Sequence, residues 1–378
     1  MKFFIDSRVL NAIDAYAFPG EYAGVLPYGC GHINDTYAVY TQLPEGGEKR
    51  YLLQKINKNV FKKPDELMKN IVGITAYLRQ SILKSGGDPE RETINLIKTA
   101  KGKDYFVDEE DEYWRCYQFI EDTLTLQIVE EPQDMFEAAR VFGSFQRRLA
   151  GYPADTLFET IPGFHDTRNR FEQFRKAVEE DVLNRAGSVK DEIEFVFRRQ
   201  NEVGLLVDLA QKGELPIRVT HNDTKLNNVL MDKNTKKGIC AVDLDTVMPG
   251  LSLYDFGDAI RFGANTAAED EKDLSKVWME ESLFEAYAKG YLQEAGSSLT
   301  DKEIELLPAG AKLMTFECGI RFLTDYLQGD TYFKIHRENH NLDRCRTQFK
   351  LVSDMEKKWD AMHAIVKKYA RRYSRNTE

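Results

Sequence analysis

The segment THNDTKLNNVL, residues 220–230, places several reactive polar side chains between apolar residues. Asp223 follows a short strand-like run, and Asn228 comes five residues later. The apolar run GICAV then leads to Asp243, twenty residues after Asp223. If the strand-like runs form a hairpin, these three side chains reach one edge of it. They would offer a carboxylate that accepts a hydrogen bond from a hydroxyl group, and two oxygen ligands for Mg²⁺.

This set of side chains suits phosphoryl transfer, which depends on positioning and on stabilising negative charge. Lys225, two residues after Asp223, could offset the charge of the transferred group. The alternative is an ordinary polar turn, because Asn and Asp form local hydrogen bonds in turns. His221, Asp223 and Asn228, however, have the spacing of the kinase pattern H-R-D-L-x-x-x-N. We therefore favour a phosphoryl-transfer site.

The motifs resemble those of the kinase-like aminoglycoside and choline phosphotransferase superfamily. Within it, they are similar to the N-acetylhexosamine 1-kinases in HNDTKLNNVL, VDLDTVMPG, LYDFGDAIRFGAN, GHINDTY and LLQKINKNVF. The matching motifs run from about Gly29 to Tyr332, which is most of the chain. The resemblance implies an α+β, protein-kinase-like fold. It also implies ATP- and Mg²⁺-dependent phosphorylation of the anomeric hydroxyl of an N-acetylhexosamine or a related sugar.

The resemblance also implies roles for the residues of the loop. Asp223 would be the catalytic base, or would at least position the acceptor hydroxyl. Asn228 and Asp243 would bind Mg²⁺. His221 would brace the catalytic loop, although a histidine is always a candidate for proton transfer near neutral pH.

Two further aspartates need separate interpretation. Asp255 begins the sequence DFG, but it stands thirty-two residues after Asp223, beyond a Pro-Gly turn. We interpret Asp255 as a structural residue that hydrogen-bonds the catalytic loop, because Asp243 leaves a strand directly and has the more natural spacing. Asp245 could be a second metal ligand or a solvated neighbour of Asp243.

The nucleotide side has no G-x-x-x-x-G-K-[ST] motif, so a P-loop is excluded. Gly29 and Gly31, in GCGHINDT, could let the backbone approach phosphate closely; the alternative is an ordinary hairpin turn. Lys55 lies in the strand-like run LLQKIN and could pair with phosphate and with Glu66, as in kinases. It could instead be an exposed edge lysine. The resemblance places a hinge in YQFIED, with Gln118 and Ile120 as adenine-binding candidates.

The acceptor side is assigned mainly by the resemblance, which places His32, Phe262, Arg321 and Tyr332 near a sugar. The alternative for Arg321 is an ion pair with Asp325, one helical turn away. Arg261 and Arg321 would disfavour choline, an amino alcohol or an aminoglycoside, which are cationic acceptors. The polar and aromatic segment 163–174 is a further candidate wall of the acceptor pocket.

Residues 1–120 are expected to form an antiparallel sheet with one long helix. The strand-like runs lie within 22–57 and in TINLIKTA, DYFVDE and EYWRCYQFI, and the helix runs from Pro64 to Gly86. Residues 121–378 are expected to form a larger helical lobe. Helix-period apolar residues occur in 132–150, 166–182, 188–212, 274–296, 302–328 and 344–372, and strand-like pieces occur at 216–219, 228–232 and 238–243.

Composition narrows the class of protein. The hydrophobic share of 42% is enough for a substantial core. The net charge of −10 argues against non-specific nucleic-acid binding. The five cysteines are dispersed, and no signal-like or membrane-spanning run is visible, so a soluble cytoplasmic protein is expected. A pseudokinase is the non-catalytic alternative, but such proteins usually lose the catalytic base or the metal ligands. The oligomeric state is left open.

Overall fold

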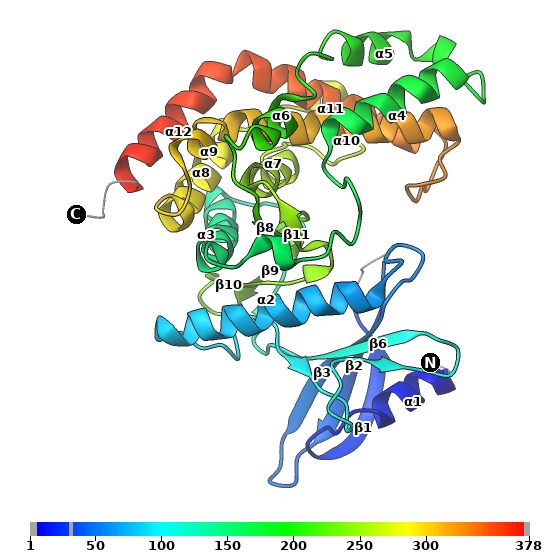
Figure 1. Ribbon diagram of the computed structural model, residues 1–378, viewed down its shortest axis with the longest axis vertical. Coiled ribbons are helices and arrows are strands. Elements are labelled where there is room, and N and C mark those ends of the chain that lie inside the picture. Colours follow the sequence, from blue (N-terminus) through cyan, green and yellow to red (C-terminus); the bar gives the residue numbers. More distant parts are fainter. Residues whose placement is uncertain (1–5, 30–32, 374–378) are drawn as a thin grey trace. The chain divides into compact units, whose positions relative to one another are not determined.

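The computed structural model describes residues 6–29 and 33–373 (Figure 1). The chain divides into two compact units, each made of separate stretches of sequence. Unit 1 comprises residues 1–124, 156–161 and 231–245, and unit 2 comprises 125–155, 162–230 and 246–378. We expected a boundary near residue 120. The first stretch of unit 1 ends close to it, at Leu124, but two later stretches also belong to this unit.

Unit 1 is built on an antiparallel sheet in the order β1-β2-β3-β6-β4, with β5 also paired to β6. Its strands are β1 (Glu21–Pro27), β2 (Asp35–Gln42), β3 (Glu48–Lys55), β4 (Leu96–Ile97), β5 (Phe106–Val107) and β6 (Tyr113–Gln118). The predicted strands are therefore present, although β4 and β5 are only two residues long. Helix α1 (Ser7–Asp14), which was not predicted, packs on one face of this sheet.

The alternation of side chains along β3 decides what each face of the sheet carries. Leu53 points to the α1 face, where it packs with Trp114 and Val9 in one apolar cluster. Gln54 points to the opposite face, because successive side chains of a strand alternate. Lys55 therefore lies on the same face as Leu53, the face covered by α1.

The predicted long helix is confirmed as α2 (Pro64–Lys84). Proline is well tolerated in a first turn, and Asp65 and Glu66 follow it there, where negative charge complements the helix dipole. The helix stops at Ser85, and Gly86 follows with a positive φ of 74°. The apolar residues of α2 repeat at helical spacing and are buried: Leu67, Met68, Ile71, Ile74, Leu78 and Ile82.

A small sheet in the order β10-β9-β7 contains the hairpin predicted from the strand-like pieces at 228–232 and 238–243. Its strands are β7 (Thr123–Leu124), β9 (Val229–Asp232) and β10 (Gly238–Ala241). The chain passes from unit 2 to unit 1 within β9, after Leu230.

Unit 2 is mainly helical, as predicted. Its longer helices are α3 (Pro132–Leu149), α4 (Thr167–Glu180), α7 (Ser252–Gly263), α8 (Glu281–Ala295), α10 (Leu307–Gln328), α11 (His340–Lys357) and α12 (Trp359–Tyr373). Three predicted helices are each divided in two. Residues 188–212 form α5 (Lys190–Phe197) and α6 (Leu205–Gln211), residues 302–328 form α9 (Asp301–Glu305) and α10, and residues 344–372 lie in α11 and α12. Pro308 explains one division, because it suits the first turn of α10 better than a helix interior.

Helix α7 was not predicted as a helix, because its residues do not show an apolar stripe. Ten of its twelve residues are buried, and they include Asp255, Asp258 and Arg261. Gly257 allows close packing, since a Cβ there would lie 2.5 Å from the carbonyl oxygen of Gly310 on α10. A helix buried on all sides has no polar face from which its period could be recognised.

A two-stranded sheet pairs β8 (Arg218–Thr220) with β11 (Met248–Gly250). The Pro-Gly turn expected at 249–250 is therefore part of a strand.

No helix in the described part of the chain is long and apolar enough to span a bilayer.

Candidate active site

The segment that follows β8 alternates between buried and accessible side chains. His221, Asn222 and Thr224 are buried, whereas Asp223 and Lys225 are partly exposed. Asn222 has a positive φ of 63°, a conformation that asparagine adopts more readily than most residues. This backbone arrangement presents the Asp223 carboxylate to the accessible side of the loop.

Asp223 and Asn228, predicted to act together, lie side by side. The Asn228 amide nitrogen donates to the Asp223 carbonyl oxygen at 2.9 Å and to its Oδ2 at 3.0 Å. Because both bonds use the amide nitrogen, the amide oxygen of Asn228 remains for another partner, as a Mg²⁺ ligand would require. The five-residue spacing is bridged by a short 3-10 turn, Leu226–Asn228.

Lys225 lies against the other oxygen of Asp223, with its Nζ 2.7 Å from Oδ1. Burial opposes the charge of this ammonium, but Asp223 and Asp258 outweigh burial and raise the pKa of Lys225. Lys225 is thus a fixed cation beside the Asp223 carboxylate.

Asp255, at the start of α7, holds the backbone immediately before Asp223. Its carboxylate accepts the N–H groups of His221 at 2.9 Å and Asn222 at 2.8 Å. It also accepts the side-chain amide of Gln146 on α3 at 2.8 Å. Burial raises the pKa of Asp255, while His221 and these donors oppose that rise. These are the loop hydrogen bonds expected for a structural aspartate.

His221 is fully buried among aromatic rings. Its imidazole makes edge contacts with Phe142 and Phe145 of α3, at centroid distances of 5.3 and 5.7 Å. Its carbonyl oxygen accepts the Thr246 hydroxyl at 2.7 Å. These contacts fit the bracing role suggested by the resemblance.

Arg261 was expected near the acceptor, and the structure corrects this expectation. Its guanidinium is buried and paired with Asp258 at 2.9 Å and with Glu269 at 2.6 Å. Asp258 also accepts the backbone N–H of Thr224 at 3.0 Å. Arg261 is thus committed to the interior of unit 2. Phe262, beside it on α7, is partly buried.

Arg321 and Tyr332, both assigned to the acceptor side by the resemblance, lie next to each other. Arg321 Nη2 lies 3.5 Å from the Tyr332 hydroxyl, and the guanidinium also lies over the rings of Phe164 and Phe333. The alternative ion pair with Asp325 is not formed. Asp325 instead accepts the backbone N–H groups of the turn that carries Tyr332, namely those of Thr331, Tyr332 and Phe333.

In unit 1, the predicted partner of Lys55 is wrong. Lys55 pairs with Asp35 of the neighbouring strand at 2.9 Å, and Glu66 pairs with Lys63. Asp35 and Lys55 are directly opposite in the β2–β3 ladder, which explains the pairing. The phosphate-binding role of Lys55 remains a prediction, but its side chain lies on the α1 face.

The opposite face carries a buried cation that the sequence analysis missed. Arg115 of β6 is almost fully buried, pairs with Asp245 at 2.5 Å and bonds Gln54 at 2.9 Å. Asn34 also donates to Asp245, at 2.6 Å. Asp245 is therefore buried and not a solvated neighbour of Asp243. Both of its carboxylate oxygens already have partners, Arg115 and Asn34, so it is not a free metal ligand. The sequence does contain a sign of this buried cation, because Arg115 stands in the middle of a strand among aromatic residues, in YWRCYQ.

Asp243, the second predicted metal ligand, belongs to unit 1, whereas Asp223 and Asn228 belong to unit 2. Asp243 has a positive φ of 61°, a conformation that aspartate, like asparagine, adopts more readily than most residues. Arg115 lies close enough to Asp243 for the two charges to interact.

The remaining nucleotide-side predictions concern backbone groups. Gly29 has a positive φ of 79°, which suits a glycine turn, while Gly31 and His32 lie outside the described residues. In the hinge, the Gln118 N–H donates to the Asn95 carbonyl at 2.9 Å. The carbonyl oxygen of Ile120 accepts the Thr123 hydroxyl at 2.8 Å. The Gln118 carbonyl and the Ile120 N–H are therefore the groups to consider for adenine.

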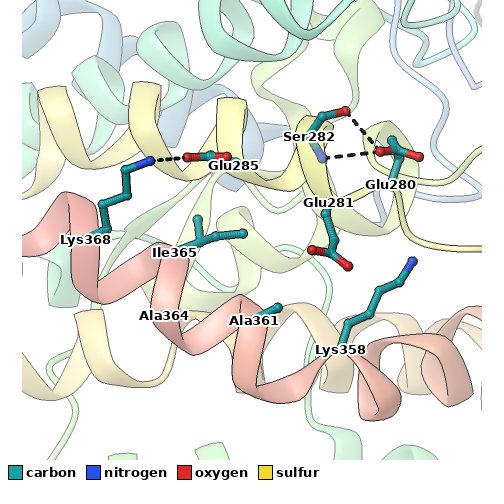
Figure 2. A pocket seen from close by; sticks show the side chains of 9 residues that line it. All are labelled: Glu280, Glu281, Ser282, Glu285, Lys358, Ala361, Ala364, Ile365 and Lys368. Atoms are coloured by element: carbon teal, nitrogen blue, oxygen red, sulfur yellow. Dashed lines mark hydrogen bonds and ion pairs between the residues drawn. The ribbon is translucent and has the colours of Figure 1, made fainter.

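A surface hollow between α8 and α12 contains none of the predicted site residues (Figure 2). It is lined by Glu280, Glu281, Ser282, Glu285, Lys358, Ala361, Ala364, Ile365 and Lys368. Two of its charged groups pair with each other, since Lys368 lies 2.6 Å from Glu285. It therefore gives no separate candidate for catalysis.

Solved structures share the fold of this chain at low sequence identity. A microcompartment-associated aminopropanol kinase is 14% identical with a TM-score of 0.56, covering 95% of this chain and 99% of its own. The amicoumacin kinase hAmiN, in complex with AMP-PNP, Ca²⁺ and Ami, is 13% identical with a TM-score of 0.54, covering 92% and 93%. A choline kinase from Cryptosporidium parvum is 15% identical with a TM-score of 0.54 and the same coverage.

These likenesses establish the protein-kinase-like architecture, with an antiparallel sheet in the N-terminal region and helices in the C-terminal region. A family model described as phosphotransferase enzyme family, APH, matches residues 26–299. This match includes β2 to α8 and every catalytic-loop residue discussed above. The chain belongs to the phosphotransferase enzyme family.

Proposed function

We propose that this protein is an ATP-dependent sugar kinase that phosphorylates the anomeric hydroxyl of an N-acetylhexosamine or a related sugar. The observation that carries the proposal is the Asp223 carboxylate, accessible and flanked by Asn228 and Lys225. Asp255 fixes the backbone of the two residues directly before it. Membership of a phosphotransferase family supports transfer of a phosphoryl group as the reaction.

Asp223 accepts a hydrogen bond from the acceptor hydroxyl, orients it and takes its proton as the hydroxyl oxygen bonds to the γ-phosphorus. The bond from that phosphorus to the β–γ bridging oxygen breaks, and ADP leaves. Lys225 fixes the carboxylate and offsets charge on the phosphoryl group. Asn228 and Asp243 would hold Mg²⁺, which supplies neutralisation of the nucleotide phosphates when it is bound. His221 and Asp255 keep the loop backbone in place, so that little reorganisation accompanies the reaction.

The nucleotide is assigned to groups of unit 1. Gly29 and Gly31 would cover the phosphates. Unit 1 offers two candidate cations for them: Lys55, which was predicted but pairs with Asp35 on the α1 face, and Arg115 on the opposite face. The Gln118 carbonyl and the Ile120 N–H would bind adenine. A nucleotide analogue and a divalent metal accompany the structurally similar amicoumacin kinase, which supports ATP with a divalent cation here.

The acceptor is the finer part of the proposal. The motif resemblance favours a sugar, with His32, Phe262, Arg321 and Tyr332 as its contacts. The alternative is an amino alcohol or choline, since structurally similar enzymes are described as aminopropanol and choline kinases. Arg321 argues against that alternative, because a guanidinium repels a cationic acceptor.

The test is ³¹P NMR of the protein with MgATP and a panel of free acceptors. The panel holds N-acetylhexosamines, their 1-O-methyl glycosides, aminopropanol, ethanolamine and choline. An anomeric sugar phosphate that disappears when C-1 is methylated supports the proposal. A phosphate ester on the methyl glycosides would move the reaction to another hydroxyl. Transfer to the amines alone would replace the sugar with an amino alcohol, and no transfer to any acceptor would favour a pseudokinase.

A further inference from the structure

Arg170 and Arg321 converge on the same aromatic residue in unit 2. Arg170, on α4, donates from Nη2 to the carbonyl oxygen of Phe164 at 3.0 Å. Arg321, on α10, lies over the ring of Phe164, with its guanidinium carbon 5.3 Å from the ring centre. The two positive charges are close enough to interact, and burial together with Arg321 lowers the pKa of Arg170. Two guanidinium groups have thus been brought together.

Neither arginine forms an ion pair with a carboxylate among the described residues. Arg170 Nη1 bonds the Gln173 amide oxygen at 3.3 Å, and its buried Nε has no hydrogen-bond partner there. Arg321 meets the Tyr332 hydroxyl and aromatic rings instead. The chain has 62 acidic and 52 basic residues, so carboxylates are in excess. Two arginines without a carboxylate partner are therefore notable, and they leave positive charge available for a ligand.

The acidic side chains of this region are engaged elsewhere. Glu317 accepts the Thr167 hydroxyl at 2.6 Å and lies 2.9 Å from His165 Nδ1. Asp166 caps the start of α4 through the Asn169 N–H, and Asp325 binds the turn at 331–333. The negative charges of Glu317 and Asp166 still favour the charged form of Arg170 from longer range. Neither supplies an oxygen in contact with a guanidinium, so donors remain for a ligand.

The arginine pair is connected to the catalytic loop through the residue next to Phe164. His165 extends from Glu317 to the carbonyl oxygen of Asn222, which its Nε2 approaches to 3.4 Å. Asn222 directly precedes Asp223. An acceptor whose hydroxyl meets Asp223 could therefore extend towards the two arginines and the ring of Tyr332.

We propose that Arg170 and Arg321 bind an oxyanion substituent, such as a carboxylate, sulfate or phosphate, on the acceptor sugar. This substrate class rests on the sugar-kinase function proposed above. Guanidinium groups suit such anions because their N–H donors match the oxygen positions, and charge-assisted hydrogen bonds are among the strongest in proteins. The exposed ring of Tyr332 would contact the apolar side of the sugar.

The experiment is isothermal titration of the full chain, without nucleotide, with N-acetylglucosamine, its 6-sulfate, its 6-phosphate and its 3-O-lactyl derivative. The proposal predicts that at least one charged sugar binds about tenfold or more tightly than the neutral parent. Which of them does so identifies the anion and its position on the ring. Binding of the neutral sugar as tightly as all three charged sugars would overturn the proposal.

Variants locate the interaction. Arg170→Gln and Arg321→Gln should each remove most of the preference for the charged sugar, while Arg170→Lys should retain part of it. Arg175→Gln is the matched control, since Arg175 lies on the same helix and pairs with Glu172 and Glu179. A preference that survives in both Gln variants would contradict the proposal. Because binding is measured without turnover, failure of the kinase function in the ³¹P experiment is a separate result.

Discussion

Asp255 shows how a residue outside the catalytic loop controls it. One buried carboxylate takes the N–H groups of His221 and Asn222 and the amide of Gln146. These bonds hold Asn222 in its left-handed conformation, and Asp223 follows in a fixed orientation. In unit 1, Arg115 holds Asp245, two residues beyond the proposed metal ligand Asp243. In both units, a buried ionisable side chain thus fixes a segment that carries a proposed functional carboxylate.

Replacing the two candidate cations of unit 1 separates their contributions to nucleotide binding. Lys55→Met should change the Kd for MgAMP-PNP by less than about twofold, because Lys55 pairs with Asp35 on the α1 face. Arg115→Met should weaken it by about tenfold or more, because Asp245 loses its partner beside Asp243. Fluorescence titration measures both, with thermal unfolding as a check that each variant is folded. The opposite ranking would restore Lys55 as the phosphate cation.

At the level of elements, Glu303 joins three segments of unit 2. From α9 it accepts bonds from Arg218 of β8 at 2.5 and 2.7 Å, and from the Ser252 hydroxyl at the start of α7 at 2.7 Å. It also accepts the Thr300 N–H, which completes the capping box of its own helix. Burial opposes its charge, but Arg218 and Thr300 outweigh burial and lower the pKa of Glu303.

Glu303→Gln should destabilise the protein by about 3 kcal/mol at pH 7, because it leaves the largely buried Arg218 side chain without a charged partner. A carboxylate with a lowered folded-state pKa contributes stability above its unfolded value of 4.5, and this contribution is lost as the pH falls through the folded value. The difference from wild type should therefore narrow below pH 4.5. Urea unfolding at several pH values measures it. Glu305→Gln, on the exposed side of α9, is the control. A difference independent of pH would contradict the assignment.

Local pattern predicted much of the element list, and the failures have physical causes. The strands β1 to β3 and helix α2 can be recognised in the sequence by their periodicity and by the turn residues that flank them. Helix α7 cannot be recognised in this way, because its charged residues are buried and paired in the interior, so the helix has no polar face. The division before α10 was readable from Pro308.

The candidate site was predictable in its residue types but not in its pairings. The spacing of Asp223 and Asn228 was sufficient, because a short turn joins them. The partners of Lys55, Asp245 and Arg261 depend on strand register and on contacts distant in sequence. Periodicity and spacing carry no information about such contacts.

At the scale of the whole molecule, each unit is assembled from stretches that are far apart in the sequence. Unit 1 needs residues 231–245, which contribute β10, part of β9 and Asp245. It also takes residues 156–161, where Asn70 of α2 bonds the backbone of Phe158 at 2.8 and 2.9 Å. The N-terminal lobe is therefore not a contiguous domain.

A fragment of residues 1–124 should consequently fail to fold cooperatively. It lacks Asp245, so Arg115 would be buried without its ion-pair partner. That loss alone costs about 3–5 kcal/mol, a large part of the stability of a typical domain. Urea titration followed by far-UV circular dichroism measures this, with the full chain as the reference. A sharp transition in the fragment would show that unit 1 is complete without its later stretches.

The proposed function depends above all on Asp223, which acts on the acceptor hydroxyl during phosphoryl transfer. The most direct measurement compares wild type with Asp223→Asn in a single-turnover transfer assay, using the acceptor found by ³¹P NMR, together with titration of MgAMP-PNP. We predict that the variant loses about a hundredfold or more of the transfer rate, because general-base catalysis contributes on that order. Its affinity for the nucleotide should stay close to that of wild type. Transfer by the variant at nearly the wild-type rate would contradict this role of Asp223.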